Sequence, residues 1–243
     1  MRLFFAIAIL LCCVTPSRAV IEYIGGVSGQ TNNSSATTDA LDTTDATLLV
    51  AVVTKYDTGD GTLADSQSNT WNALTERTNG GGAIKLRMYW CAAPTTNASH
   101  TFSYTGSTIY PGLAVLAFKG THASPYDQEN GGGSGSAGTS GQPGSLTPSE
   151  DNCVVITGWT LSSTTTVGPS INSSFNTPIY EAGNAGVNQP TAISYKIQTT
   201  AGAENPTWSW GTSRTYALNI ASFKAAASGS AVPVIFHNSQ LHR

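Results

Sequence analysis

Charged residues are scarce in this sequence of 243 residues, because Asp, Glu, Lys and Arg together make up only 10% of it. The 11 Lys and Arg residues are outnumbered by 14 acidic residues, which gives a formal net charge of −3. Nucleic acids bind proteins through dense positive charge that neutralises their phosphates. No basic run or basic amphipathic helix stands out, so we expect neither a nucleic-acid partner nor adhesion to an anionic membrane.

The strong helix formers Lys and Glu are also rare, whereas Ser, Thr and Gly are abundant. Thr favours strands, and Gly and Ser favour the turns between them. The composition therefore predicts a protein built from strands and turns.

Catalytic motifs are missing as well. The sequence has no G-x-S-x-G elbow, no H-E-x-x-H pair and no P-loop. Its histidines are far apart, and its cysteines do not have the spacing of a zinc site. We therefore expect no enzymatic activity. The alternative is a glycan-active hydrolase that takes two carboxylates from distant strands, with Glu76, Glu181 and Glu204 as candidates.

The first segment has the pattern of a secretory signal peptide. Met1 and Arg2 give a positive start, an apolar run covers residues 3–14, and small residues stand at Ser17 and Ala19. The apolar run is shorter than the roughly 20 residues that a membrane-spanning helix needs. We predict that residues 1–19 are removed, that the mature chain has no stable membrane span, and that it is secreted or lies at the cell surface.

Removal of this segment leaves two of the four cysteines, Cys91 and Cys153. Export to an oxidising compartment makes a disulfide between them possible. Two buried free thiols are the alternative, since cysteine also packs as a small apolar residue.

The remaining chain contains an internal duplication. Residues 41–50 match residues 146–155 at an offset of 105, and LAVLAFK at 113–119 matches LNIASFK at 218–224. Tyr89 is matched by Tyr195, and residues 102–104 (FSY) by residues 208–210 (WSW), both at an offset of 106. The two copies span about residues 21–120 and 130–225.

Each copy reads as at least five strands. Residues 48–53 and 113–118 are continuous apolar runs, which are typical of strands covered on both faces, and residues 84–90 alternate with period two. We predict an all-β protein, a jelly-roll-like antiparallel β-sandwich over residues 20–227 built from the two pseudo-repeats, followed by a tail at 228–243. Two tandem immunoglobulin-like sandwiches are the alternative.

The Gly-rich stretch at 131–141 has the composition of a flexible linker. It is in register with residues 27–36 of the first copy, which precede a predicted strand. We therefore predict a surface loop at 131–141 and keep a linker as the alternative.

Acidic residues are densest at Asp57, Asp60 and Asp65, near two glycines. Carboxylates on such a loop can gather oxygen ligands around Ca²⁺, so a calcium site is possible, with no other cofactor expected. A solvated turn is the default interpretation, because Asp-Gly favours turns, and the calcium site is the alternative.

Aromatic residues provide candidate ligand contacts. Trp208 and Trp210 are two positions apart, so both face one side of a strand and could stack on the apolar faces of sugars. Because Phe102 and Tyr104 hold the same places in the first copy, we favour a core role for this pair and keep the ligand role as the alternative. Tyr110 and Tyr126 are predicted to lie in loops, free to bind, whereas core positions are predicted for Trp71, Trp90 and Trp159.

Four segments resemble a β-sandwich module of uncharacterised exported and phage-associated bacterial surface proteins: residues 65–71 (DSQSNTW), 89–92 (YWCA), 125–128 (PYDQ) and 205–210 (NPTWSW). The similarity covers most of the mature chain. It implies a β-sandwich and no particular activity or functional residue.

We therefore expect a secreted, non-catalytic binding module that recognises a glycan or a surface protein. A structural subunit of a virion, filament or cell surface, which would self-associate, is the alternative.

Overall fold

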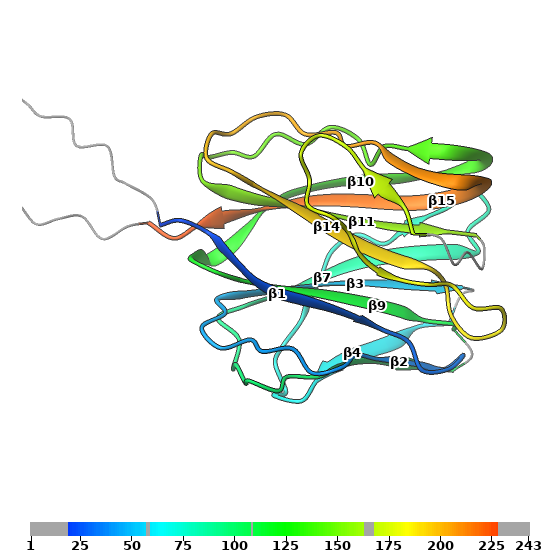
Figure 1. Cartoon of the computed structure of the whole chain (residues 1–243), viewed down its shortest axis with the longest axis horizontal. Coiled ribbons are helices and arrows are strands. Elements are labelled where there is room, and N and C mark those ends of the chain that lie inside the picture. Colours follow the sequence, from blue (N-terminus) through cyan, green and yellow to red (C-terminus); the bar gives the residue numbers. More distant parts are fainter. Residues whose placement is uncertain (1–18, 57–58, 108, 163–167, 228–243) are drawn as a thin grey trace, which may run out of the picture.

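The computed structural model describes residues 19–56, 59–107, 109–162 and 168–227, which form a stack of antiparallel β-sheets without any helix (Figure 1). The predicted all-β antiparallel sandwich is confirmed. Almost all of the predicted signal peptide, and the tail at 228–243, lie outside the described residues. Within the described part of the chain there is no helix that could span a membrane.

The first copy folds into one large and one small sheet. Its strands are β1 (Glu22–Gly29), β2 (Ser35–Thr37), β3 (Leu48–Tyr56), β4 (Gly61–Asp65), β5 (Asn72–Ala73), β6 (Arg77–Thr78), β7 (Ile84–Ala92), β8 (Phe102–Gly106) and β9 (Gly112–Lys119). The large sheet has the order β1-β9-β3-β7-β5, with β6 also paired to β7. The small sheet has the order β2-β8-β4 and covers one face of the large sheet.

The second copy repeats this order. Its strands are β10 (Thr121–Gly141), β11 (Cys153–Leu161), β12 (Ser170–Ile171), β13 (Ile179–Glu181), β14 (Thr191–Gln198) and β15 (Trp208–Ala225). The sheet order β10-β15-β11-β14-β13 reproduces β1-β9-β3-β7-β5 strand for strand. The first residues of β15 pair with β12 and with the end of β10, as β8 pairs with β4 and β2. The long strands β10 and β15 thus each join two strands that are separate in the first copy.

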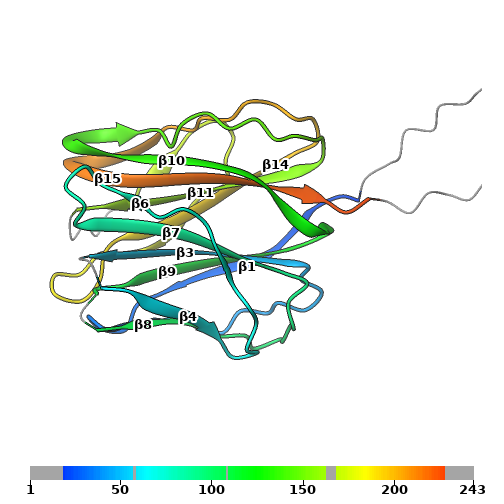
Figure 2. The same cartoon turned by 180° about the vertical axis from the view of Figure 1, so that it is seen from behind.

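The two large sheets pack face to face, and the main core lies between them (Figures 1 and 2). In β3 the even-numbered Leu48, Val50 and Val52 enter this central core. The odd-numbered side chains of the same strand enter a second core beneath the small sheet. Period-two alternation places both sets, so β3 is buried on both faces as its continuous apolar run predicts.

The pairing register corrects the alignment of the two copies. In the central strand of the first sheet, Val50 pairs with Trp90 on one side and with Leu116 on the other. In the central strand of the second sheet, Ile156 pairs with Tyr195 and Ala221. Val50 and Ile156 both face the central core, so the offset in this strand is 106. The offset of 105 expected for it is wrong, because a shift of one residue turns every side chain to the opposite face. For the same reason Tyr195 corresponds to Trp90 and not to Tyr89.

The Gly-rich stretch is neither a linker nor a loop. Residues 131–141 belong to β10, the edge strand of the second sheet, which pairs along its length with β15. A Cβ atom at Gly133 would lie 2.1 Å from the carbonyl oxygen of Thr78 and 2.5 Å from that of Tyr216. The glycine lets the backbones of the two copies approach closely, which explains the composition without flexibility.

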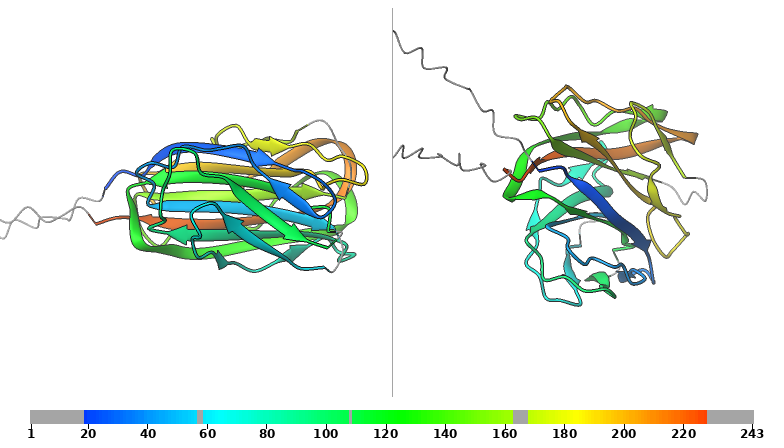
Figure 3. Two further views of the ribbon diagram at one scale, coloured as in Figure 1. Left: turned by 90° about the horizontal axis from the view of Figure 1, so that it is seen from below. Right: turned by 60° about the vertical axis from the view of Figure 1, so that its left-hand side comes forward.

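The two ends of the described chain meet at one end of the sandwich (Figure 3). The backbone N–H of Ala19 donates to the carbonyl oxygen of Ala226 at 2.9 Å. The first and the last described strands therefore have their outer ends side by side at this end of the sandwich.

Candidate functional site

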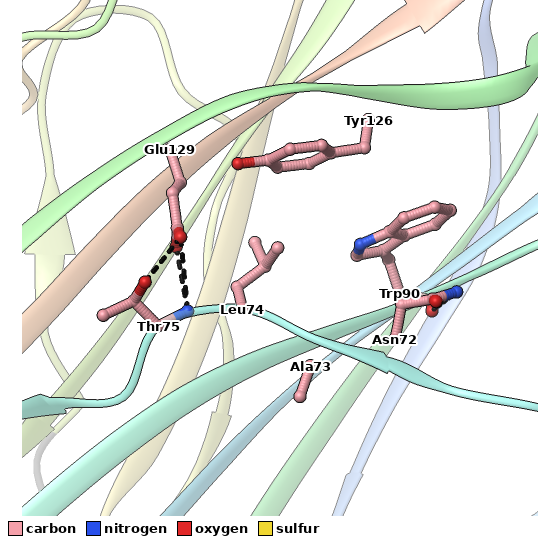
Figure 4. A pocket seen from close by; sticks show the side chains of 7 residues that line it. All are labelled: Asn72, Ala73, Leu74, Thr75, Trp90, Tyr126 and Glu129. Atoms are coloured by element: carbon pink, nitrogen blue, oxygen red, sulfur yellow. Dashed lines mark hydrogen bonds between the residues drawn. The ribbon is translucent and has the colours of Figure 1, made fainter.

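A groove of about 480 Å³ opens along one edge of the seam between the two large sheets (Figure 4). The first copy contributes the segment around β5 and the end of β7, and the second copy contributes β10. Its lining residues are Asn72, Ala73, Leu74, Thr75, Trp90, Tyr126 and Glu129. We call this the seam groove.

Two aromatic rings form the apolar part of the seam groove. The Trp90 and Tyr126 rings are nearly parallel, with an interplanar angle of 9° and centroids 6.0 Å apart. Phe223, which is fully buried, makes edge contacts with Trp90 at 6.3 Å and with Tyr126 at 6.4 Å. The two rings are thus anchored on the central core while part of each remains exposed.

A carboxylate forms the polar part. The two Glu129 oxygens accept hydrogen bonds from the Thr75 backbone N–H at 3.1 Å and from the Thr75 hydroxyl at 2.7 Å (Figure 4). Arg77 Nη2 lies 3.8 Å from Glu129 Oε2. A carboxylate has about four acceptor sites, so Glu129 keeps acceptor capacity for a ligand hydroxyl.

The phenol of Tyr126 stays protonated at neutral pH. Burial raises its pKa, and the nearby carboxylates of Glu129 and Asp127 raise it further. A neutral phenol can both donate and accept a hydrogen bond, and its hydroxyl points toward the Glu129 side of the groove (Figure 4).

Tyr110, the other tyrosine predicted to bind, lies in a different and smaller pocket. This pocket of about 240 Å³ is lined by Tyr56, Tyr110, Gly186 and Gln189. The Tyr110 and Tyr56 rings meet edge to face at 6.1 Å. The backbone of Tyr110 has a φ of 49° and is held by Gln189, whose N–H donates to the Tyr110 carbonyl at 2.9 Å. Tyr110 and Tyr126 therefore do not form one site.

Trp208 and Trp210 do not form a binding platform. Trp208 is fully buried and Trp210 is 6% exposed, both in the outer core of the second copy beside Trp159. The Trp208 Nε1–H donates to the Thr157 hydroxyl at 3.1 Å, and the Trp210 Nε1–H donates to the Gly138 carbonyl at 2.7 Å. The ligand role considered for them is wrong, because burial of both rings leaves no face for a sugar.

The predicted calcium cluster does not assemble from Asp60 and Asp65. They lie at the two ends of β4, and five residues of extended strand separate them by roughly 17 Å. Asp60 is exposed and accepts from Lys55 Nζ at 2.5 Å. Asp57 lies outside the described residues, and no group of three or more His, Cys, Asp or Glu side chains in the described ranges could hold a metal ion.

Asp65 instead belongs to a buried polar cluster. His100 Nε2 lies 3.1 Å from Asp65 Oδ1, and the other ring nitrogen lies 3.0 Å from the Thr43 hydroxyl. The Trp71 Nε1–H donates to Asp65 Oδ2 at 2.7 Å. The order Thr43–His100–Asp65 is that of a nucleophile, a base and an acid, but all three side chains are fully buried. The cluster ties the small sheet to its loops and has no face toward a substrate.

Cys91 and Cys153 are free, buried thiols. Cys91 lies in the core beneath the small sheet, whereas Cys153 lies in the outer core of the second copy, so the central core separates them. The disulfide considered for them is wrong, since its geometry needs Cα atoms within about 7 Å. Burial raises the pKa of Cys91 to about 11 and that of Cys153 to about 12.

The three candidate carboxylates of a hydrolase have separate sets of partners. Glu76 contacts Lys55, Lys85 and Arg87 at 3.4–3.9 Å. Glu204 is buried and accepts from Lys196 Nζ at 2.5 Å. Glu181 accepts from the Ser28 hydroxyl at 3.2 Å, and burial raises its pKa.

Sequence reasoning missed Trp90 and Glu129 as groove residues. Trp90 continues the alternation of Leu86 and Met88 and was predicted to be core, yet the second copy covers only part of its ring. Glu129 follows Tyr126 by three positions, so regular alternation would place the two side chains on opposite faces of the strand. A bulge in β10 after Tyr126 inserts one residue, and both side chains therefore line the groove. A register-based alignment of the copies would have shown the aromatic match of Trp90 with Tyr195.

Comparisons of the chain with known protein families, with curated proteins and with solved structures find no match.

Proposed function

We propose that the protein is a non-catalytic glycan-binding module and that the seam groove is its binding site. The observation that carries this proposal is the pair of parallel, partly exposed rings of Trp90 and Tyr126 beside the Glu129 carboxylate. Sugar rings have apolar C–H faces that pack on aromatic rings and hydroxyl groups that need hydrogen-bond partners. A site for a sugar therefore needs both parts at close range.

The groove supports a neutral sugar in particular. Glu129 and the exposed amide of Asn72 offer acceptors and donors for hydroxyl groups. A carboxylate on the ligand would meet Glu129 on a protein whose formal net charge is already −3. The predicted export of the chain would bring the groove into contact with extracellular or cell-surface glycans.

The test is a glycan array followed by calorimetric titration of the best neutral glycan with the protein from residue 20 onward. Trp90→Ala should weaken binding at least about tenfold, a loss of about 1.4 kcal/mol, because it removes one stacking face. Tyr56→Ala is the matched control, since Tyr56 is also an exposed aromatic residue (43% exposed) but lies in the other pocket. Absence of binding to any glycan, or equal affinity in Trp90→Ala, would disprove the proposal.

Self-association as a surface or assembly subunit is the second candidate. Among the described residues, β1 and β10 each pair along one side only and form the outer edges of the two large sheets. Long edge strands can pair with an edge of a second molecule. Light scattering after size-exclusion chromatography tests this candidate, and a monomer at high concentration would refute it.

A further inference from the structure

The seam groove has a counterpart on the opposite edge of the seam, where the two stacked rings lie closer together. Each edge carries one aromatic triad with equivalent members in the two copies: Trp90, Tyr126 and Phe223 at the groove, and Tyr195, Tyr23 and Phe118 opposite. Tyr23 pairs with Phe118 in the strand register as Tyr126 pairs with Phe223. The triads are thus related by the duplication, and each takes two residues from one copy and one from the other.

The two triads differ in how tightly their stacked rings approach. The Tyr23 and Tyr195 centroids are 4.6 Å apart, whereas those of Tyr126 and Trp90 are 6.0 Å apart. Both separations lie within the range of about 4.5–7 Å for aromatic pairs, but the rings of the wider pair cover less of each other. The wider pair leaves ring surface for a ligand.

One strand position close to the tyrosine carries different residues at the two edges, and this difference accounts for the two ring separations. Glu129 pairs with Ala221, and Gly26 pairs with Leu116, which is the counterpart of Ala221. Position 129 therefore carries a carboxylate side chain where the equivalent position 26 carries none.

The Tyr23 side chain occupies the space above Gly26. A Cβ atom built at Gly26 would lie 2.9 Å from the Tyr23 hydroxyl oxygen and 2.7 Å from Leu116 Cδ2. A side chain at this position would have to displace the Tyr23 hydroxyl and the end of the Leu116 side chain, because both distances are shorter than van der Waals contacts. Glycine at position 26 therefore leaves the space that the Tyr23 ring uses when it stacks on Tyr195.

We infer that Glu129 is a positioning residue that holds the seam groove open by filling the place into which the Tyr126 ring would otherwise settle. Its two hydrogen bonds to Thr75, at 3.1 and 2.7 Å, fix the carboxylate on the first copy. The side chain therefore acts as a spacer beside the Tyr126 hydroxyl, at the place that Gly26 leaves open to Tyr23 in the first copy (Figure 4). Only the consequence for ligand binding rests on the proposed function; the ring geometry does not.

The test measures the exposure of Trp90 by acrylamide quenching of its fluorescence. Trp159, Trp208 and Trp210 are at most 6% exposed, so a Trp71→Phe background leaves Trp90 as the main quenched residue. In that background Glu129→Gly should lower the quenching constant by about half, because the closing Tyr126 ring covers one indole face. Glu129→Gln is the matched control, since it keeps the shape of the spacer and should leave quenching unchanged.

The reciprocal variant provides a second, independent measurement. Gly26→Glu should displace Tyr23 from Tyr195, which is seen as a faster iodination of the partly buried Tyr195 in peptide mapping, while the Glu129 side of the molecule is unchanged. Unchanged quenching in a folded Glu129→Gly protein, or unchanged Tyr195 reactivity in Gly26→Glu, would overturn the inference.

Glycan titration separates this inference from the proposed function. If the parent protein binds a neutral glycan, Glu129→Gly should weaken binding at least about tenfold. If the parent binds no glycan but quenching falls as expected, the spacer role stands and the glycan proposal fails.

Discussion

Replacement of Trp208 by alanine should destabilise the protein strongly and leave the seam groove intact. Trp208 is fully buried in the outer core of the second copy, and its ring stacks on Trp159 with centroids 6.4 Å apart. This core lies on the other face of the second sheet from the central core that supports Trp90. Stability and ligand binding should therefore separate in this variant.

The expected loss follows from burial. A buried aromatic side chain removes about 150–250 Å² from water, and truncation of buried Phe or Trp to Ala costs about 3–5 kcal/mol. The Thr157 hydroxyl, which accepts from Trp208, also donates to the Asn219 carbonyl at 2.6 Å, so it keeps a partner. We expect a loss of about 4 kcal/mol, which for a domain of this size lowers Tm by about 8–16 °C.

Urea unfolding followed by far-ultraviolet circular dichroism measures this loss. Ser209→Ala is the matched control, because Ser209 is the next residue of β15 and points to the opposite side. It should change stability by less than about 0.5 kcal/mol. A loss below about 1.5 kcal/mol for Trp208→Ala, or lost glycan binding without lost stability, would refute the core assignment.

Three further predictions concern buried polar and backbone features. Burial alone would raise the pKa of Asp65, but hydrogen bonds, His100 first, outweigh it and lower the pKa. The ionised Asp65 therefore stabilises the folded state above about pH 4, and this stabilisation is lost as the pH falls through the lowered pKa. Asp65→Asn should reduce the free energy of unfolding by about 3 kcal/mol at pH 7 and should make that free energy less dependent on pH under acidic conditions. Cys91 and Cys153 should react with iodoacetamide at pH 8 only after unfolding, and a disulfide-linked peptide in non-reducing mass spectrometry would contradict this. Gly133→Ala should cost about 1–3 kcal/mol in urea unfolding, whereas Gly132→Ala, whose Cβ would have no atom within 4 Å, should cost much less; equal losses would contradict the close backbone approach.

Much of the architecture could be predicted from local pattern. The apolar runs at β3 and β9 identify strands buried on both faces, and the match of LAVLAFK with LNIASFK places β9 and β15 in equivalent positions. Both predictions need only period-two alternation and a count along the chain.

The glycine-rich part of β10 could not be predicted in this way. Its composition is typical of a loop, and nothing near it in sequence indicates that the Thr78 backbone lies against Gly133. The need for glycine comes from a neighbour in the other copy. Local propensity therefore favours the wrong structure here.

The sequence by itself determined the strand content, the duplication and the fact that both copies bury apolar residues. The tertiary structure alone decided which residues meet at the seam. The face of each strand depends on register, and a shift of one residue reverses it, so the string match that paired Tyr89 with Tyr195 hid the true partner Trp90. The groove exists because strands distant in the chain bring Trp90, Tyr126 and Glu129 together. Contacts of this kind are set by the packing of whole sheets, which no local pattern specifies.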